Sequence, residues 1–436
     1  MERELNCSDI LLFPSELIYK KLNKKNLVIS PLTANWIVVD DNAMPYLKKL
    51  IDGFSIEKVF ESIKDGDENI FINLLKGICA QKFADTEEIK PKDAHLFDNM
   101  NILLTNGCNL RCKHCYLSAG EKKEKELTVD EWKNVLLQFS ENGGKTLCLS
   151  GGEPLVYKGF DLLIKYAKEL GFEVKLNTNG ILWTDSMIKD LSPYLDEVQI
   201  SLDGYNEETN SIIRGKGFFS KIYLTIIKFA KANVKVKIAT TLDYELLKNN
   251  NIKDEYRKLC RKIEKDSGRE DIIFALTKRL IDGRNVHLSE EENEEYEKKV
   301  RAIEDYANDG LGAISFIAAV DRNTIVRSCG IGSLTISPNG DVAACNMPSK
   351  LGIIGNIKHA PLSKYIEEGK RIFEKSAIEN ISECSNCHLR YICGGGCRVD
   401  KFNIVNDEFI RRKCSDKYKE QIERRMIEAF EKYYIF

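Results

Sequence analysis

The chain has 436 residues, of which 43% are hydrophobic and 30% are charged, as is typical of a folded globular protein rather than a disordered or fibrous one. Its 65 basic and 67 acidic residues give a formal net charge of −2, which favours neither nucleic acid nor a membrane as a partner. The segment MERELNCSDI lacks the apolar core of a secretory signal, and no stretch reaches the ~18 apolar residues of a membrane span. We therefore expect a cytoplasmic protein.

The first predicted domain covers residues 1–95. It begins with the β-rich stretch 27–41, which predicts a hairpin or two short strands. Three helices should follow, at residues 42–53, 55–65 and 69–83, with Asn42 and Ser55 as the caps of the first two. The polar run 84–95 is typical of a linker. Strands followed by short helices suggest a small winged-helix-like module.

Strands and helices then alternate through a second predicted domain, residues 96–315. The predicted strands are residues 101–107, 145–150, 172–180, 196–204, 234–243 and 271–281, with amphipathic helices between them. This alternation predicts an α/β fold with parallel strands and outer helices. Because active sites of such folds lie at the carboxyl ends of the strands, the loops after these strands should form one site.

The chain contains 14 cysteines, and their number and spacing give the clearest indication of function in the composition. Ten of them cluster, three near residue 110 and seven between residues 329 and 414. Clustered cysteines of an intracellular protein favour metal binding over disulfides. The isolated cysteines are interpreted as buried or surface thiols without a special role; they are Cys7, Cys79, Cys148 and Cys260.

The first cluster is the motif CNLRCKHC, with Cys108, Cys112 and Cys115. Zinc usually takes four ligands, and the adjacent His114 is badly placed to be the fourth because it directly precedes Cys115. Three thiolates at this spacing can instead hold an iron–sulfur cluster and leave one iron open for a chelating ligand.

This motif, in the loop after the first strand of the α/β pattern, resembles the signature CxxxCxxC of the radical S-adenosylmethionine (SAM) superfamily. The resemblance implies a partial (β/α)6 barrel whose three cysteines bind a [4Fe–4S] cluster. It also implies that SAM chelates the open iron and is cleaved by one electron to methionine and a 5′-deoxyadenosyl radical, which takes a hydrogen atom from the substrate.

Several other strand-end residues match positions that the family uses to bind SAM. The segment LSGGEP resembles the family's GGEP motif, in which the glycines permit close approach of the backbone to a ligand. Asp203 is interpreted as a turn or helix-cap residue. The SAM contacts implied by the resemblance are Gly151, Gly152, Glu153, Asn179, Ser201 and Arg214.

The seven C-terminal cysteines, in a third predicted domain at residues 316–436, resemble the SPASM domain of some radical SAM enzymes. That domain carries two auxiliary [4Fe–4S] clusters, so the resemblance implies three clusters in total. The first implied ligand set is Cys384, Cys387, Cys393 and Cys414. The second is Cys329, Cys345 and Cys397. The second set is one cysteine short, and a substrate thiolate, a non-cysteine residue or a distant cysteine could complete it. Asn346, where sulfatase-maturating relatives have Asp, speaks against that activity.

The three domains together resemble enzymes that modify ribosomally synthesised peptides. The resemblance implies a precursor peptide whose leader binds residues 1–95 by adding a strand to a sheet edge, and a flavodoxin- or ferredoxin-type reductant. The predicted product is a cysteine thioether, and the alternatives are a carbon–carbon crosslink or the oxidation of a small cofactor precursor. An iron–sulfur sensor with a DNA-binding winged helix is disfavoured by the β/α units and by the mixed charge of residues 1–95.

Overall fold

The structure, a computed structural model, describes residues 5–22, 24–85, 96–121, 125–280, 283–308, 327–329, 331–346, 351–399, 401–405, 408–412 and 414–433. The chain forms two compact units. Unit 1 contains Met1–Ala94, Ile314–Cys329 and Phe373–Phe436, and unit 2 contains His95–Ala313 and Gly330–Ile372.

Unit 2 is built on a nine-stranded sheet in the order β12-β11-β10-β4-β5-β6-β7-β8-β9. Six neighbouring strands, from β4 to β9, are parallel, as the sequence predicts. They are β4 (Asn99–Leu103), β5 (Thr146–Ser150), β6 (Glu173–Thr178), β7 (Glu197–Ser201), β8 (Lys235–Thr240) and β9 (Ile273–Leu276). The large parallel α/β sheet is therefore confirmed.

Three further strands extend the sheet beside β4 and were not predicted. Strand β10 (Leu334–Ile336) runs parallel to β4, and β11 (Asp341–Ala343) and β12 (Gly355–Asn356) continue as antiparallel neighbours. They come from the cysteine-rich region, which the sequence showed only as rich in turns. Strands of two or three residues are too short to give a periodic signal.

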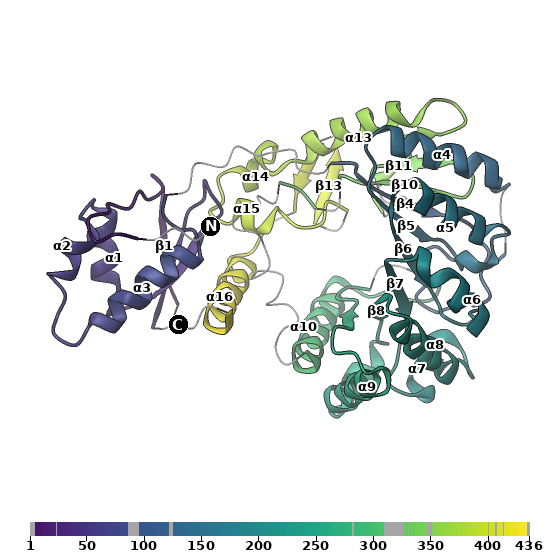
Figure 1. Cartoon of the computed structure of the whole chain (residues 1–436), viewed down its shortest axis with the longest axis horizontal. Coiled ribbons are helices and arrows are strands. Elements are labelled where there is room, and N and C mark those ends of the chain that lie inside the picture. The colour runs from purple at the N-terminus through teal and green to yellow at the C-terminus, as the bar shows by residue number, and fades with distance from the viewer. Residues whose placement is uncertain are drawn as a thin grey trace. The chain divides into compact units, whose positions relative to one another are not determined.

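Helices lie along one face of this sheet (Figure 1). They are α4 (Val129–Glu141), α5 (Phe160–Glu169), α6 (Asp185–Leu191), α7 (Glu207–Arg214), α8 (Phe219–Lys231), α9 (Ile252–Ser267) and α10 (Glu290–Ala307), with single 3-10 turns at η1 (Pro154–Val156), η2 (Ser192–Tyr194) and η3 (Glu245–Lys248). The predicted capping box of Thr128 and Glu131 begins α4. Helix α7, which carries Arg214, was not predicted.

The core of unit 2 lies between the parallel strands and these helices. Alternate strand residues such as Leu147, Leu176 and Ile200 are fully buried, and so is Trp132 of α4. Strands whose buried residues alternate pack one face on the helices and leave the carboxyl-end loops to form the site. No helix among the described residues is long and apolar enough to cross a membrane.

Unit 1 contains a three-stranded antiparallel sheet, with β1 (Ile18–Leu22), β2 (Lys25–Ile29) and β3 (Trp36–Asp40), and three helices, α1 (Met44–Ile51), α2 (Ile56–Phe60) and α3 (Glu68–Ala80). Strand β1 was missed because it precedes the clear alternation. Ser55 caps α2 as predicted, by accepting a hydrogen bond from the Lys58 backbone N–H. The prediction that Asn42 caps α1 is wrong: the cap is Ala43, and Pro45 follows in the first turn. The linker prediction lies almost entirely outside the described residues.

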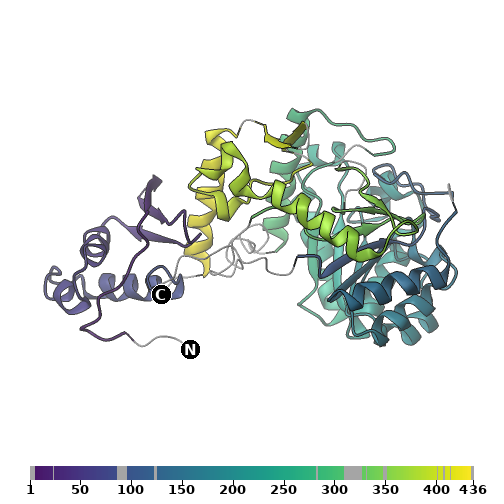
Figure 2. The same cartoon turned by 90° about the horizontal axis from the view of Figure 1, so that it is seen from above.

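The C-terminal helices and hairpin complete unit 1. After α13 (Leu362–Ser376) come η4 (Ile378–Asn380), α14 (Ser382–Ser385), α15 (Arg390–Cys393), the hairpin of β13 (Phe402–Val405) and β14 (Glu408–Arg411), and α16 (Asp416–Tyr433). Helix α16 packs on the N-terminal sheet at β2 and β3, as Figures 1 and 2 show. The rings of Trp36 and Phe430 are 6.4 Å apart, and Met426 is fully buried.

Candidate functional site

The three-cysteine motif lies in the loop that follows β4, at the carboxyl end of the parallel sheet. The loop turns so that the Leu110 N–H donates to the Cys108 sulfur over 3.4 Å, and the Ala119 N–H donates to the Cys115 sulfur over 3.4 Å. Backbone N–H groups directed at cysteine sulfur stabilise thiolates, which are the ligands of iron–sulfur clusters. The donor set therefore fits the predicted [4Fe–4S] cluster.

The segment that follows β9 makes several hydrogen bonds to this loop. No residue of this segment was identified as functional from the sequence. The Arg284 guanidinium donates to the carbonyl of Cys112 over 3.1 Å and also to that of Ala119. The backbone N–H groups of Arg284 and Asn285 donate to the carbonyls of Cys115 and Lys113 over 3.2 and 2.9 Å. These hydrogen bonds fix the path of the cysteine loop from outside the motif. Only tertiary structure brings residues this distant in the sequence together.

The glycines of the GGEP turn allow the loop after β5 to lie directly on the cysteine loop. A Cβ atom on Gly151, whose φ is +132°, would lie 2.6 Å from the Thr105 carbonyl oxygen, and one on Gly152 would overlap the Gly107 carbonyl. The N–H of Gly152 donates to Thr105 over 2.7 Å. The structure thus shows these glycines in close contact with the backbone that leads into the motif, and their predicted approach to a bound ligand stays a prediction.

Glu153 is fully buried at the end of this turn. Its carboxylate accepts hydrogen bonds from the Thr178 hydroxyl over 2.7 Å and from the Asn179 N–H over 2.8 Å. Burial raises the pKa of Glu153 to about 7, although these hydrogen bonds oppose the change. The raised pKa places the change between the charged and neutral carboxyl near neutral pH, and Glu153 is itself one of the residues that the resemblance assigns to SAM.

Replacing Glu153 with Gln should stabilise the apoprotein above neutral pH. A carboxyl whose pKa is raised in the folded state binds more protons folded than unfolded, so its contribution to stability falls as pH rises from about 4.5 to about 7. Gln mimics the neutral carboxyl, so the variant should avoid this decrease in the free energy of unfolding, which is about 3 kcal/mol for such a shift. Urea unfolding of both proteins at about pH 5 and about pH 8 measures the free energies, and the variant should gain stability over the parent mainly at the higher pH. The exposed Glu169→Gln is the matched control, and an equal effect of both variants would contradict the burial argument.

Two more of the predicted SAM contacts lie at strand ends beside the loop. The Asn179 side chain donates to the Asn109 side chain over 2.8 Å, and its nitrogen lies 4.0 Å from the Cys108 sulfur. Ser201 is the last residue of β7 and is half-buried. Asn179 therefore contacts the cysteine loop directly. Ser201 shares with it the carboxyl edge of the sheet, at the end of β7.

Arg214 reaches the same loop from the end of α7 and is paired with a buried carboxylate. Its Nε atom lies 2.7 Å from Oδ2 of Asp203, and its Nη1 atom lies 3.9 Å from the Cys112 sulfur. Oδ1 of Asp203 accepts the Thr241 N–H over 2.8 Å, and His114 Nε2 lies 3.8 Å from Oδ2. Asp203 is thus more than the turn residue predicted from sequence, because its carboxylate holds Arg214 in place.

Burial and this ion pair determine the charges beside the loop. Burial lowers the pKa of Arg214, but Asp203 together with Cys112 and Cys108 raises it by more, so that the net pKa is raised and the guanidinium stays charged. Burial raises the pKa of Cys112 to about 11, which Arg214 partly opposes. The free thiol is therefore neutral, and binding to iron would replace its proton. A fixed cation beside an anionic cluster also suits the carboxylate of a chelating amino acid.

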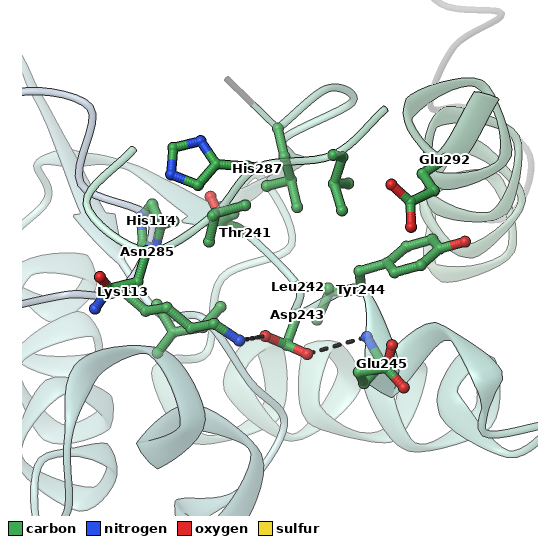
Figure 3. Close-up of a pocket in the computed structure, with 14 residues that line it drawn as sticks. Lys113, His114, Thr241, Leu242, Asp243, Tyr244, Glu245, Asn285, His287 and Glu292 are labelled. Atoms are coloured by element: carbon green, nitrogen blue, oxygen red, sulfur yellow. Dashed lines mark hydrogen bonds and ion pairs between the residues drawn. The ribbon is translucent and has the colours of Figure 1, made fainter. Parts of the chain in front are cut away.

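A cleft of about 220 Å³ opens beside the motif at the ends of β8 and β9 (Figure 3). Lys113, inside the motif, forms an ion pair of 2.7 Å with Asp243, whose other oxygen accepts the Glu245 N–H over 3.0 Å. Polar side chains from the loops after β8 and β9 face this space. The cleft provides room for a ligand next to the predicted cluster.

Four C-terminal cysteines line one small cavity in unit 1, of about 20 Å³. They are Cys384, Cys387, Cys393 and Cys414, the members of the first implied auxiliary set. Three successive glycines between Cys393 and Cys397 have positive φ, from +58° to +77°, a backbone path that side chains with a Cβ disfavour. The glycines therefore allow a tight turn between two of the cysteines, and four thiols around one cavity are a donor set that fits a metal cluster.

The second implied ligand set is divided between the two units: Cys329 and Cys397 belong to unit 1, and Cys345 belongs to unit 2. The Cys329 sulfur accepts the N–H of Arg398, the residue after Cys397, over 3.3 Å. Cys345 belongs to unit 2, where it is buried beside Asn346. Among the described residues, no three His, Cys, Asp or Glu side chains already have the geometry of a metal site. Of the isolated cysteines, Cys260 is buried, Cys148 is half-buried, and Cys7 and Cys79 are exposed.

Comparison with known families identifies the part of the chain that carries the three-cysteine loop. Residues 102–259 match the model of the radical SAM superfamily. The chain contains a radical SAM domain. This family uses SAM and a [4Fe–4S] cluster, as the sequence predicts. The match runs from the end of β4 to the middle of α9 and includes the cysteine loop, the GGEP turn and Arg214.

Two curated relatives are proteins of Bacillus subtilis (strain 168). The sporulation killing factor maturation protein SkfB is 36% identical over 153 residues, which are 35% of this chain and 37% of SkfB. The antilisterial bacteriocin subtilosin biosynthesis protein AlbA is 25% identical over 330 residues, 73% of this chain and 71% of AlbA. The alignment thus spans little more than a third of the length of SkfB, and over two thirds of AlbA.

A solved structure extends the similarity beyond the radical SAM domain. Streptococcus suis SuiB, crystallised with the precursor peptide SuiA, matches with a TM-score of 0.52 and 16% identity, covering 92% of this chain and 99% of that chain. At this identity the similarity concerns the fold. The radical SAM α/β fold of unit 2 agrees with it.

Proposed function

We propose that this protein is a radical SAM enzyme that modifies a ribosomally synthesised precursor peptide, most simply by forming a cysteine thioether. The observation that carries the proposal is the convergence of the three-cysteine loop, Glu153, Asn179 and Arg214 at one edge of the parallel sheet. SkfB and AlbA are maturation and biosynthesis proteins of peptides, and SuiB binds a precursor peptide, which supports a peptide substrate.

Different side chains of the radical SAM domain would bind the iron–sulfur cluster and the different parts of SAM. Cys108, Cys112 and Cys115 would bind three irons of the cluster, which with SAM supplies the 5′-deoxyadenosyl radical when both are bound. Arg214, fixed by Asp203, would bind the SAM carboxylate. The GGEP turn with Glu153 would meet the SAM amino group, and Asn179 and Ser201 would contact the ribose. The neighbouring cleft would admit the reacting part of the peptide.

Two auxiliary [4Fe–4S] clusters belong to the proposal, for a total of three. One is held by Cys384, Cys387, Cys393 and Cys414, which line one cavity. The other is held by Cys329, Cys345 and Cys397, and its open position would take the substrate thiolate. Thioether formation removes one hydrogen from the thiol and one from a carbon, so two electrons leave the peptide. Bound SAM would supply the radical that removes the hydrogen atom from the carbon, the cluster held by Cys329, Cys345 and Cys397 would supply an acceptor for the second electron, and the thiol proton would leave to solvent.

Residues 1–95 would bind the leader of the precursor, residues 96–315 would carry SAM chemistry, and residues 316–436 would hold the auxiliary clusters. Within the described residues, the three-stranded sheet of the first segment has β1 and β3 as its edge strands, and a leader can add to such an edge. A flavodoxin or ferredoxin would supply the electron for SAM cleavage. A reducing compartment such as the cytoplasm suits the many thiols.

Mass spectrometry of a co-expressed Cys-containing precursor, encoded beside this gene, tests the proposal. We expect a loss of two hydrogens for each modified cysteine, and those thiols should resist alkylation. A core peptide without its leader should be processed ~10²-fold less efficiently, because the leader raises the effective concentration of the core. A scrambled leader is the control.

The other outcomes decide among the alternatives. Loss of two hydrogens with all thiols still free would replace the thioether with a carbon–carbon crosslink. An unchanged mass and connectivity for every neighbouring precursor would refute peptide crosslinking and favour a small cofactor precursor. Equal processing with native and scrambled leaders would remove the role assigned to residues 1–95.

A further inference from the structure

Two arginine side chains are buried around the glycine turn that follows Cys393, one of the four cysteines of the C-terminal cavity. Arg398 is fully buried, and Arg411 is 7% exposed. Both guanidinium groups lie over the ring of Phe402, with Cζ atoms 4.6 and 5.4 Å from the ring centroid. Arg411 is the register partner of Phe402 across the β13–β14 hairpin. One buried aromatic ring therefore helps to hold both positive charges.

The hydrogen-bond partners of these arginines are backbone carbonyls. Arg398 donates to Ser376 over 2.8 and 2.6 Å, and to Gly394 and Gly396 over 2.7 and 2.6 Å. Arg411 donates to the carbonyl of Gly395. Within the described residues, none of the hydrogen bonds or ion pairs of the two guanidinium groups involves a carboxylate. Two buried cations without a counter-charge are costly, so an anion should lie beside them.

The cavity that Arg411 lines contains two kinds of group that can carry negative charge: the carboxylate of Glu383, which is exposed, and the four cysteines, which supply the charge once they bind metal. Arg411 lines the cavity with Cys384, Cys387, Cys393 and Cys414. Cysteine binds metal as the thiolate, so the negative charge appears beside Arg411 when these four sulfurs bind a cluster.

We propose that Arg398 and Arg411 are the built-in counter-charges of the auxiliary cluster at these four cysteines, and that they raise its reduction potential. This inference rests on the proposed function. A [4Fe–4S] cluster with four thiolates carries two negative charges when oxidised and three when it has accepted one electron. No bond forms or breaks in that step. Fixed positive charges stabilise the −3 state more strongly than the −2 state, so they would make the oxidised cluster a better electron acceptor.

Potentiometric titration of the holoprotein, followed by electron paramagnetic resonance, tests this role. A Cys112→Ala and Cys345→Ala background removes the signals of the SAM-binding cluster and of the second auxiliary cluster, and leaves the cluster beside Arg411. At a fixed potential, Arg411→Gln should lower the ratio of reduced to oxidised cluster at least tenfold, or ~59 mV for one electron. Arg411→Lys, which keeps the charge, should lie nearer the wild type. Arg412→Gln is the matched control, because its side chain is exposed on the next residue.

The possible failures are distinguishable. A wild-type potential in Arg411→Gln would overturn the inference while leaving the cluster in place. An iron content that is the same in Cys384→Ala as in the parent would refute the auxiliary cluster itself, and with it that part of the proposed function. If Arg411→Gln assembles no cluster, Arg411→Lys decides: a near wild-type potential supports the role of charge, and loss of the cluster there as well overturns it.

Discussion

Replacing Cys112 with Ala is expected to reduce formation of 5′-deoxyadenosine from SAM to the background level. Cys112 lies at the centre of the motif after β4, and its sulfur is the one that Arg214 approaches. Two remaining cysteines cannot hold a cluster whose fourth iron must stay open for SAM, because a second iron would lose its protein ligand. Chromatographic quantification of 5′-deoxyadenosine, with chemical reduction and excess SAM, provides the measurement.

Cys79→Ala is the matched control for this variant. Cys79 is an exposed residue of α3 and belongs to neither cysteine cluster, so its replacement should leave SAM cleavage and iron content unchanged. Iron analysis should show that Cys112→Ala has lost one cluster and retained the auxiliary iron. SAM cleavage at the parental rate in Cys112→Ala would overturn the assignment of the SAM site.

Replacing Asp203 with Asn should destabilise the apoprotein by ~3–5 kcal/mol, because it leaves the buried Arg214 charge without its partner. The side chains of Asp203 and Arg214 are only 1% and 6% exposed, so water cannot replace the lost carboxylate. The measurement is the midpoint of urea unfolding of protein prepared without clusters, which separates stability from cofactor binding.

An exposed ion pair of the same domain provides the comparison. Asp185 lies 2.5 Å from Lys228, with exposed fractions of 80% and 43%. Asp185→Asn should therefore cost only ~0–1 kcal/mol. The double variant Asp203→Asn with Arg214→Met should recover part of the loss, since both buried charges are then absent. Equal effects of Asp203→Asn and Asp185→Asn would show that the buried pair contributes no special stability.

The sequence was sufficient to predict the parallel sheet because its elements are locally encoded. The β5 strand alternates buried Leu147 and Leu149 with polar neighbours, and the helix that precedes it begins with the capping box of Thr128 and Glu131. Such signals act over a few residues and are readable without tertiary structure. The spacing of Cys108, Cys112 and Cys115 is local in the same sense, which is why the motif identified the family.

The parts that could not be predicted depend on contacts between distant residues. Asp203 has the sequence context of a turn, and only the packing of α7 shows that it pairs with Arg214. Arg284 lies in no motif, yet it binds two carbonyls of the cysteine loop. Tertiary packing decides each of these cases.

The packing of α16 on β2 and β3 has a consequence for how the chain folds during synthesis. The apolar side chains of Leu27, Ile29 and Trp36 find their partners in a helix that the ribosome makes almost four hundred residues later. The amino-terminal sheet therefore emerges first yet completes its core last, after unit 2 has had time to fold. Until then its exposed apolar surface is a site where a nascent chain can be held by a chaperone.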